Sequence, residues 1–130
     1  MAAPSPQRPA ADVLLVDDDP SGLAILGLAL RRAGLSVVSF SNPNAAIEEL
    51  RRRRFRWLVT DAQMTPQDGF ELARIARQSD PDLRIVMISA LVSESDIEDT
   101  PIERLFSKPV PFENLVAWLK DTGGQPPAWR

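Results

Sequence analysis

The sequence predicts one α/β domain built on a parallel sheet with helices on both faces. Short apolar runs alternate five times with segments of helical periodicity, which is typical of that class. Several of these runs end directly in an Asp, Ser or Lys, and ligands bind at the carboxyl ends of strands in open α/β sheets. A chain of 130 residues, 44% of them hydrophobic and 25% charged, is long enough for one buried core.

Five strands are expected from short apolar runs, and the third is also marked by β-branched and aromatic residues before a turn-rich segment. They are placed at 13–16, 35–40, 55–60, 83–88 and 104–107. No internal repeat and no domain boundary is visible. Periodicity alone leaves the order of the strands in the sheet open.

Helices are expected between the strands. Asp19 can cap the first helix, Pro20 suits its first turn and Gly34 suits its end. The second begins by the same logic at Asn42-Pro43. The remaining helices are expected at 67–79, weakly at 93–99 before Pro101, and at 111–120. The inward apolar positions are predicted to be Leu23, Leu26, Leu30 and Ala33, then Ala46, Ile47 and Leu50, then Phe70, Leu72, Ile75 and Ala76, and finally Phe112, Leu115, Val116 and Leu119.

Composition limits the chemistry that the chain can perform. Cysteine and histidine are absent, which excludes disulfides, thiolate or imidazole metal sites and Ser-His or Cys-His catalysis. The net charge of -3 gives no reason to expect nucleic-acid binding, and no apolar run is long enough for a membrane span. A cytoplasmic protein is expected. We predict a disordered tail at 1–10, one domain at 11–121 and a flexible tail at 122–130.

Polar residues capable of chemistry gather at the predicted strand ends. Asp17 and Asp18 follow the first strand, Asp61 ends the third, Ser89 follows the fourth and Lys108 follows the fifth. In a parallel sheet these ends share one edge, so the five side chains should converge. Three carboxylates repel one another unless a cation joins them, and a hard divalent ion such as Mg²⁺ suits that ligand set. A lysine with a nearby hydroxyl also suits a phosphoryl group.

These residues resemble the receiver domain of bacterial response regulators, the phosphoacceptor half of two-component signalling. The resemblance covers about 12–120. It rests on the Asp pair in Leu14-Leu15-Val16-Asp17-Asp18-Asp19-Pro20, on Asp61-x-x-Met64 running into Asp68-Gly69, on Ser89-Ala90 after an apolar strand, and on Lys108-Pro109.

The resemblance implies a role for each acid. Asp61 would take a phosphoryl group from a phosphohistidine on a histidine kinase or a histidine phosphotransfer protein. Asp18 and Asp61 would bind Mg²⁺ with the backbone carbonyl of Gln63, while Asp17 would act mostly through a metal-bound water. Such a domain is no enzyme in the ordinary sense, because at most it catalyses its own phosphorylation and dephosphorylation.

Further implications concern the fold and the switch. Lys108 would pair with the phosphate, Ser89 would move to hydrogen-bond it, and the bond before Pro109 would be cis. The fold would be flavodoxin-like, a three-layer α/β/α arrangement of a five-stranded parallel sheet in the order 2-1-3-4-5. The domain would be a monomer or a phosphorylation-linked dimer that switches the binding of a downstream partner.

The chain departs from the family pattern in four places. The proline that usually follows Met64 directly comes one place late, at Pro66, and the hydroxyl residue is Ser89 where Thr is commoner. The switch position that usually holds an aromatic residue is Leu105, and Phe106 should face the other side of its strand. The segment 90–107 is short, so the fourth helix should be short or irregular.

Two other functions remain open from the sequence. A haloacid-dehalogenase-type aspartyl-phosphate phosphohydrolase would use Asp17 as its nucleophile in the pattern Asp17-x-Asp19. A pseudo-receiver would bind partners without ever carrying phosphate. Simpler roles are expected elsewhere: Asp19 and Asp68-Gly69 for capping and turn formation, Arg51 to Arg54 for a solvated helix end, and Trp57 for a core position near the site.

Overall fold

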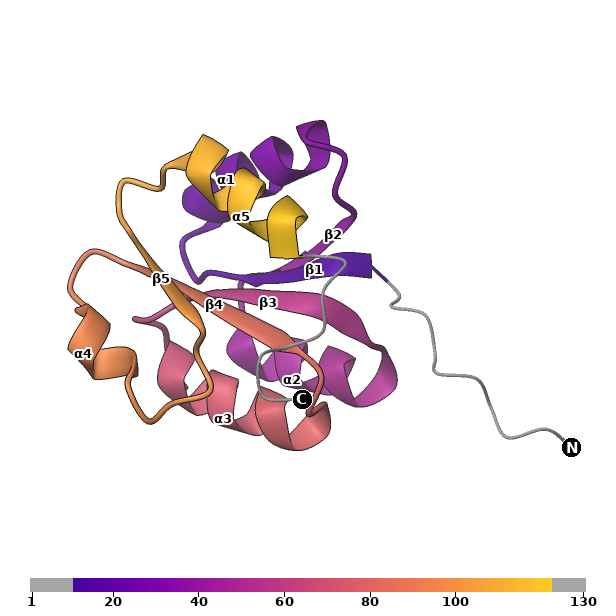
Figure 1. Cartoon of the computed structure of the whole chain (residues 1–130). Coiled ribbons are helices and arrows are strands. Elements are labelled where there is room, and N and C mark those ends of the chain that lie inside the picture. The colour runs from indigo at the N-terminus through magenta and orange to yellow at the C-terminus, as the bar shows by residue number, and fades with distance from the viewer. Residues whose placement is uncertain (1–10, 123–130) are drawn as a thin grey trace, which may run out of the picture.

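The computed structural model describes residues 11–122, so both predicted tails, apart from Thr122, lie outside the described residues. Five parallel strands form one sheet in the order β2-β1-β3-β4-β5, which confirms the flavodoxin-like order (Figure 1). The strands are β1 (Ala11–Val16), β2 (Val37–Phe40), β3 (Phe55–Asp61), β4 (Arg84–Ser89) and β5 (Arg104–Ser107). The helices are α1 (Pro20–Arg32), α2 (Pro43–Arg52), α3 (Gly69–Ser79), α4 (Glu94–Ile97) and α5 (Phe112–Thr122).

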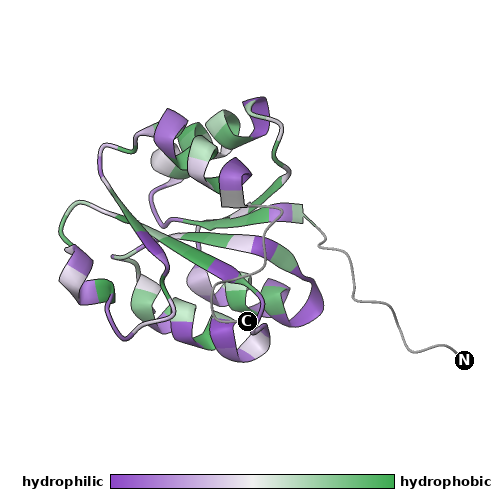
Figure 2. Cartoon of the chain, in the orientation of Figure 1, coloured by the Kyte–Doolittle hydropathy of each residue, from purple (hydrophilic) through white to green (hydrophobic). Residues whose placement is uncertain are grey.

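Helices cover both faces of the sheet. Helices α1 and α5 lie on one face and α2 and α3 on the other, with α4 at the end of the sheet that lies to the left in Figure 1. The strands carry the most hydrophobic stretches of the chain, as Figure 2 shows, because both of their faces are buried. Two core clusters result, one on each face. The first includes Leu14, Leu58 and Leu72, and the second includes Leu15, Val59 and Leu115.

Side-chain caps start three of the helices at the carboxyl edge of the sheet. The Asp19 carboxylate accepts hydrogen bonds from the backbone N–H groups of Ser21 and Gly22, as predicted for a cap of α1. Asn42 caps α2 in the same way, and Asp68 caps α3 by accepting from the N–H of Glu71. The chain therefore passes from strand to helix within three residues after β1 and β2, and through the longer loop 62–68 after β3.

The α4 region is the most irregular part of the fold. Helix α4 has four residues, and Asp99 just after it has a positive φ of 60°. Pro101 follows closely and cannot continue a helix. The prediction of a short fourth helix is confirmed.

The last helix differs from prediction in two ways. It spans Phe112–Thr122, whereas the prediction was 111–120. Phe112, predicted to point inward, is 37% exposed, whereas Leu115 and Leu119 are fully buried. Periodicity placed Phe112 on the inner stripe of α5, but in the structure Phe112 lines an open hollow with Ile25 and Leu26 of α1 and does not belong to the core cluster under α5.

Strand β5 presents consecutive residues to opposite faces. Leu105 packs in the cluster beneath α2 and α3, and Phe106 packs in the cluster beneath α1 and α5. The Phe106 ring makes an edge contact with Trp118 of α5 at a centroid distance of 6.5 Å. The predicted orientation of Phe106, away from the Leu105 face, is confirmed. Within residues 11–122, no helix has both the length and the apolar character that a membrane span requires.

Candidate phosphoacceptor site

Five polar residues meet at the carboxyl edge of the sheet, as the order of the strands predicts. Asp17 and Asp18 directly follow β1, Asp61 is the last residue of β3, Ser89 is the last of β4 and Lys108 directly follows β5. Strands β1, β3 and β4 are direct neighbours in the sheet, so their ends bring these side chains close together.

The three carboxylates form a compact cluster. One oxygen from each of Asp17, Asp18 and Asp61 lies within 4.8 Å of the others. Asp17 and Asp61 are only 8% and 9% exposed, whereas Asp18 is exposed. Backbone N–H groups orient the two buried carboxylates: Asp17 Oδ1 accepts from Asp19 at 3.0 Å, and Asp61 Oδ1 accepts from Ala62 at 2.8 Å.

Lys108 provides the positive charge that faces this cluster. Its Nζ donates a hydrogen bond to Asp61 Oδ2 at 3.2 Å and lies 4.0 Å from Asp17 Oδ2. Partial burial alone would lower the pKa of Lys108, but the hydrogen bond and the charge of Asp61, together with the charge of Asp17, raise it overall. Lys108 therefore stays protonated at neutral pH and is held on Asp61.

The cluster is electrostatically incomplete. Burial raises the pKa of the Asp17 carboxyl, and the nearby charge of Asp61 raises it further, although the Asp19 N–H and Lys108 oppose the shift. One ammonium faces three carboxylates, so a divalent cation would balance the charge. The oxygen donors present fit Mg²⁺, which prefers carboxylate, carbonyl and water ligands. Gln63 is exposed in the loop after β3 and lines the same hollow as Asp18.

Ser89 is buried, and its hydroxyl hydrogen-bonds to the loop that follows β4. The Oγ atom accepts a hydrogen bond from the backbone N–H of Leu91 at 3.1 Å. The backbone of Ser89 also ties two strand ends together, because its carbonyl accepts from the N–H of Lys108 at 3.2 Å. The structure thus brings Ser89 to the site edge with its hydroxyl directed to the β4–α4 loop and not to Asp61.

Two peptide bonds at this edge are cis. The Lys108–Pro109 bond is cis, as the resemblance implies. The Thr65–Pro66 bond, in the loop where the proline is displaced by one place, is also cis and was not anticipated.

Gly69 is a site residue that sequence reasoning assigned only to turn formation. A Cβ atom at this position would clash with the backbone carbonyl oxygen of Asp61, and it would lie 3.0 Å from both Ala62 Cα and Met87 Cε. Gly69 N–H also donates to the Ala62 carbonyl at 2.8 Å. The loop after β3 therefore returns onto the backbone of Asp61, and a glycine is required there. The Asp68-Gly69 pair in the sequence signals a turn but not this close approach.

An apolar hollow adjoins the cluster on the α1 and α5 side. It measures about 190 Å³, and Asp17, Asp61 and Lys108 lie at its polar end. We call it the α1–α5 hollow; its apolar wall includes Ile25, Leu26, Val110 and Phe112. Ile25 is 56% exposed, so the apolar wall continues onto the surface of α1. This feature was not predicted, because it depends on how the start of α5 sits against α1.

Three secondary expectations can be compared with the structure. Asp19 is a helix cap, as expected, and Arg51 to Arg54 are exposed at the end of α2, where Arg54 pairs with Asp80 at 2.9 Å. Trp57 is buried in the core, but the expectation that it lies near the site is wrong. It precedes Asp61 by four residues along β3, which separates the two by about 13 Å.

Comparison with known proteins is consistent with this geometry. The family model for the response regulator receiver domain matches residues 13–120. The response regulator receiver protein CpdR of Brucella abortus is 39% identical over 107 residues, covering 80% of this chain and 89% of that protein. The transcriptional regulatory protein GlrR of Escherichia coli is 31% identical over 114 residues, and the match covers 85% of this chain but only 26% of that longer protein.

Solved structures agree in fold. A putative response regulator from Chloroflexus aurantiacus superposes with a TM-score of 0.80 at 25% identity and covers 91% of this chain and all of its own. A CheY-like receiver domain from Methanospirillum hungatei gives a TM-score of 0.80 at 20% identity, covering 85% of this chain and 91% of its own. The sheet order, the acidic edge and these matches agree, and the chain belongs to the response regulator receiver domain family of two-component signalling.

Proposed function

We propose that this chain accepts a phosphoryl group on Asp61 from a phosphohistidine of a histidine kinase or a histidine phosphotransfer protein, in the cytoplasm and with Mg²⁺. One observation carries the proposal: the Asp61 carboxylate is almost fully buried, 3.2 Å from the Lys108 ammonium and clustered with two further carboxylates. Receiver domains are signalling modules that interact with histidine kinases, which fits this donor class.

The transfer is a single displacement at phosphorus. A carboxylate oxygen of Asp61 forms the new P–O bond as the P–N bond to the donor imidazole breaks. The imidazole nitrogen keeps the electron pair of that bond and takes up a proton. The product is an acyl phosphate, which places about -1.5 to -2 charges at Asp61.

The residues around Asp61 suit this change in charge. Lys108 is already hydrogen-bonded to Asp61 Oδ2 and can follow the phosphoryl oxygens. Asp18, Asp61 and the Gln63 carbonyl would hold Mg²⁺, with Asp17 contributing through a bound water, and the ion would supply charge neutralisation for the transferred phosphoryl group. The Ser89 hydroxyl can turn from Leu91 toward the new phosphoryl oxygens.

The switch should differ from the usual one, because Leu105 replaces the aromatic residue that fills the space vacated by the hydroxyl residue. Leu105 is buried and has no polar atom on its side chain. The loop after Ser89 is better placed to respond, since the Leu91 N–H bonds to the Ser89 hydroxyl. We infer that phosphorylation is transmitted by residues 90–96.

The phosphohydrolase alternative has less support. In that mechanism Asp17 is the nucleophile and Asp19 assists it, yet both Asp19 carboxylate oxygens accept hydrogen bonds from the start of α1. Lys108 is also closer to Asp61 than to Asp17, at 3.2 Å against 4.0 Å. A pseudo-receiver would not need such a complete set of charged groups.

Incubation with Mg²⁺ and acetyl phosphate, followed by intact mass measurement and peptide mapping, tests the proposal. We expect one phosphoryl group on the peptide that contains Asp61 and no label when Mg²⁺ is chelated. Label on Asp17 would favour the phosphohydrolase, and no label under any condition would favour a pseudo-receiver.

A further inference from the structure

A second hollow lies beside the carboxylate cluster, formed by the loop after β3, the start of α3 and the loop after β4. It measures about 490 Å³ and is open to solvent. We call it the β3–β4 groove and define it by Asp18, Met64, Asp68, Phe70 and Val92. It shares no lining residue with the α1–α5 hollow.

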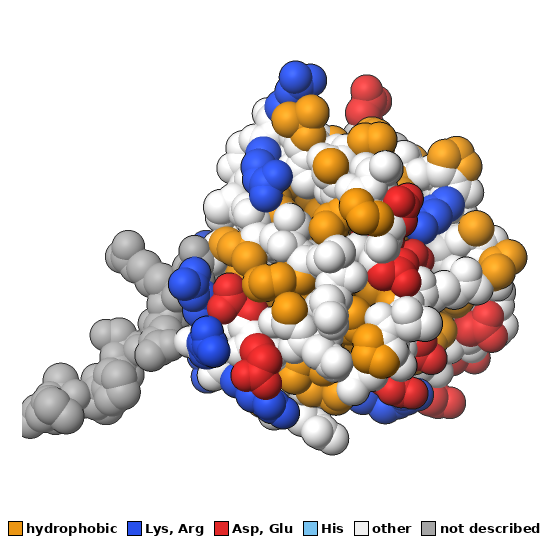
Figure 3. All heavy atoms as spheres, turned by 180° about the vertical axis from the view of Figure 1, so that it is seen from behind, with side chains coloured by type: hydrophobic (Ala, Val, Ile, Leu, Met, Phe, Trp, Pro, Cys, Tyr) orange, Lys and Arg blue, Asp and Glu red, His pale blue; other side chains and the backbone are white. Residues whose placement is uncertain are grey.

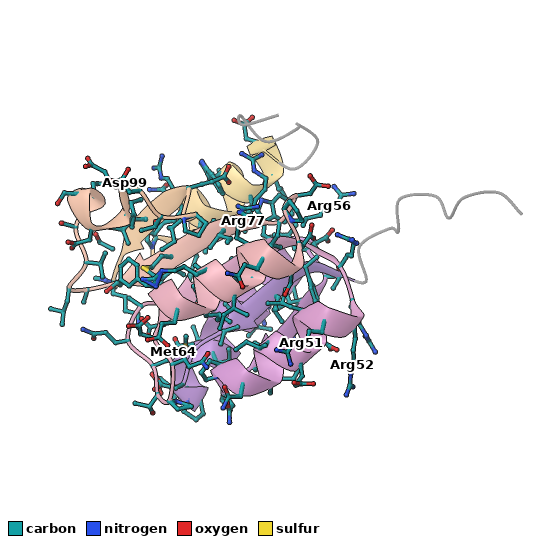
Figure 4. All side chains as sticks on the ribbon, turned by 90° about the horizontal axis from the view of Figure 1, so that it is seen from below. Arg51, Arg52, Arg56, Met64, Arg77 and Asp99 are labelled. Carbon is teal, nitrogen blue, oxygen red and sulfur yellow. The ribbon has the colours of Figure 1, made fainter. Side chains whose placement is uncertain are left out.

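The floor of the β3–β4 groove is apolar. Phe70 and Val92 are partly buried and pack against the core beneath α2 and α3, and Met64 belongs to that core at 6% exposure. Leu91, next to Val92, is 74% exposed. Figure 4 places Met64 at the opposite end of the α2–α3 layer from Arg51 and Arg52. A groove lined by a methionine and an aromatic ring is an adaptable surface for an incoming side chain.

The rim of the groove is acidic. Asp18 and Asp68 line the groove and are both exposed; Glu71 and Glu94, in the first turns of α3 and α4, are not among its lining residues. No lysine or arginine is among the described residues that line it. Figure 3, which views the molecule from behind, shows acidic and apolar side chains exposed beside one another on its right-hand part, with a basic side chain among them.

We propose that the β3–β4 groove binds a partner segment that carries a lysine or arginine next to a bulky apolar side chain. The apolar side chain would pack on Met64, Phe70 and Val92, and the cation would face Asp18 and Asp68. Charge complementarity selects this occupant, because an acidic segment would meet only like charges.

Binding in the β3–β4 groove is coupled to binding at the phosphoacceptor site. This coupling rests on the proposed function. One wall of the groove is the loop that directly follows Asp61. The other is the loop after Ser89, and the Ser89 hydroxyl accepts a hydrogen bond from the Leu91 N–H at 3.1 Å. Asp18 belongs both to the groove and to the carboxylate cluster. Mg²⁺ bound there removes the charge that attracts the cationic segment, so each ligand weakens the other by the same factor.

Peptide titration followed by ¹H–¹⁵N NMR tests the proposal with the full chain. The probe is acetyl-Gly-Arg-Phe-Gly-amide, without Mg²⁺. Saturable shifts are expected at Met64, Phe70 and Val92, with a Kd of about 1–10 mM for so short a peptide. The matched peptides acetyl-Gly-Glu-Phe-Gly-amide and acetyl-Gly-Arg-Ala-Gly-amide should each bind at least about threefold more weakly.

Two variants sharpen the test. Asp68→Asn keeps the cap of α3, because Asn caps as well as Asp, but it removes the charge. Asp68→Asn should weaken binding of the Arg-Phe peptide about threefold and should not weaken binding of the Glu-Phe peptide. Asp121→Asn makes the same charge change at the far end of α5 and should leave peptide affinity unchanged.

Separate arms distinguish failure of this inference from failure of the proposed function. Peptide binding without Mg²⁺ tests the groove alone, and Mg²⁺ binding without peptide tests the carboxylate cluster alone. Three results would contradict binding in the β3–β4 groove. They are chemical-shift changes centred on Ile25 and Phe112, equal affinity for the Arg and Glu peptides, and no saturable shift at all. If Mg²⁺ binds but leaves peptide affinity unchanged, Asp18 has no part in the groove and the proposed coupling is wrong.

Discussion

Asp61 is the residue on which the phosphoacceptor proposal depends. Replacing it by Asn keeps the shape of the side chain but removes the nucleophilic carboxylate and one metal-binding oxygen. We expect Asp61→Asn to abolish labelling by acetyl phosphate in the mass measurement, while Asp19→Asn, which retains a cap for α1, still labels. If the Asp61→Asn protein labels as fast as the native one, Asp61 is not the acceptor.

The acids beside Asp61 should contribute unequally to metal binding. Asp18 is exposed and in reach of a cation, whereas Asp17 is buried and partly engaged by the Asp19 N–H. We therefore expect Asp18→Ala to lower the Mg²⁺ affinity at least about tenfold, which corresponds to about 1.4 kcal/mol. Asp17→Ala should lower the Mg²⁺ affinity less. Isothermal titration calorimetry is the suitable measurement, because Trp57 lies too far from the site to report on it. Equal affinity in native protein and Asp18→Ala would exclude Asp18 as a ligand.

Gly69 supports Asp61 from the neighbouring turn. Gly69→Ala should destabilise the fold by about 1–3 kcal/mol, because the added methyl meets the Asp61 carbonyl, which cannot yield without moving the acceptor. Mg²⁺ affinity should fall as well. Gly34→Ala is the matched control: it strains a backbone with φ of +92° but meets no neighbouring atom within 4 Å. Gly34→Ala should therefore lose stability without losing Mg²⁺ affinity.

At the scale of the elements, the turn after α4 stores strain. Asp99 has a φ of 60°, a conformation that Gly adopts without cost and other residues disfavour by about 1–3 kcal/mol. Asp99→Gly should stabilise the protein by up to about 1 kcal/mol in chemical denaturation. The neighbouring change Glu98→Gly, at a φ of -58°, should instead destabilise it by about 0.5–1 kcal/mol. Equal effects of the two substitutions would show that backbone conformation is not the cause.

Helix α4 also carries a pH-dependent cap. The Asp96 carboxylate accepts from the Ser93 N–H at 2.8 Å and from the Ser93 hydroxyl at 3.0 Å, and these two bonds lower the pKa of Asp96. A lowered folded pKa means that the bonds stabilise α4 fully above the ordinary value of 3.8 and are lost as pH falls through the folded pKa. NMR titration of the Asp96 carboxyl carbon should give a midpoint below 3.8, and Ser93→Ala should raise it. A midpoint at or above 3.8 would contradict the cap.

At the scale of the whole molecule, the response to phosphorylation should concentrate in one loop. Amide hydrogen exchange with and without beryllofluoride should change most at residues 90–96, because the Ser89 hydroxyl leaves the Leu91 N–H for the phosphate mimic. Changes centred on Leu105 and Phe106, with residues 90–96 unaffected, would show that β5 carries the response instead.

The site could be predicted from the sequence because it is made of strand ends. Apolar runs that stop at Asp17, Asp61 and Lys108 locate those residues at one edge as soon as the strands are parallel. Contacts that depend on how neighbouring elements pack were not predictable in the same way. Phe112 lines the α1–α5 hollow and not the core, and Gly69 returns onto Asp61 through a loop whose path periodicity does not encode.

The absence of any shared lining residue between the α1–α5 hollow and the β3–β4 groove has a kinetic consequence. A molecule that occupies the α1–α5 hollow and a partner that sits in the β3–β4 groove need not compete for the same atoms. Both can be bound at once without Mg²⁺, but Mg²⁺ at Asp18 weakens the partner in the groove. Because the proposed transfer requires Mg²⁺, release of the partner would begin with Mg²⁺ binding, before the phosphoryl group arrives.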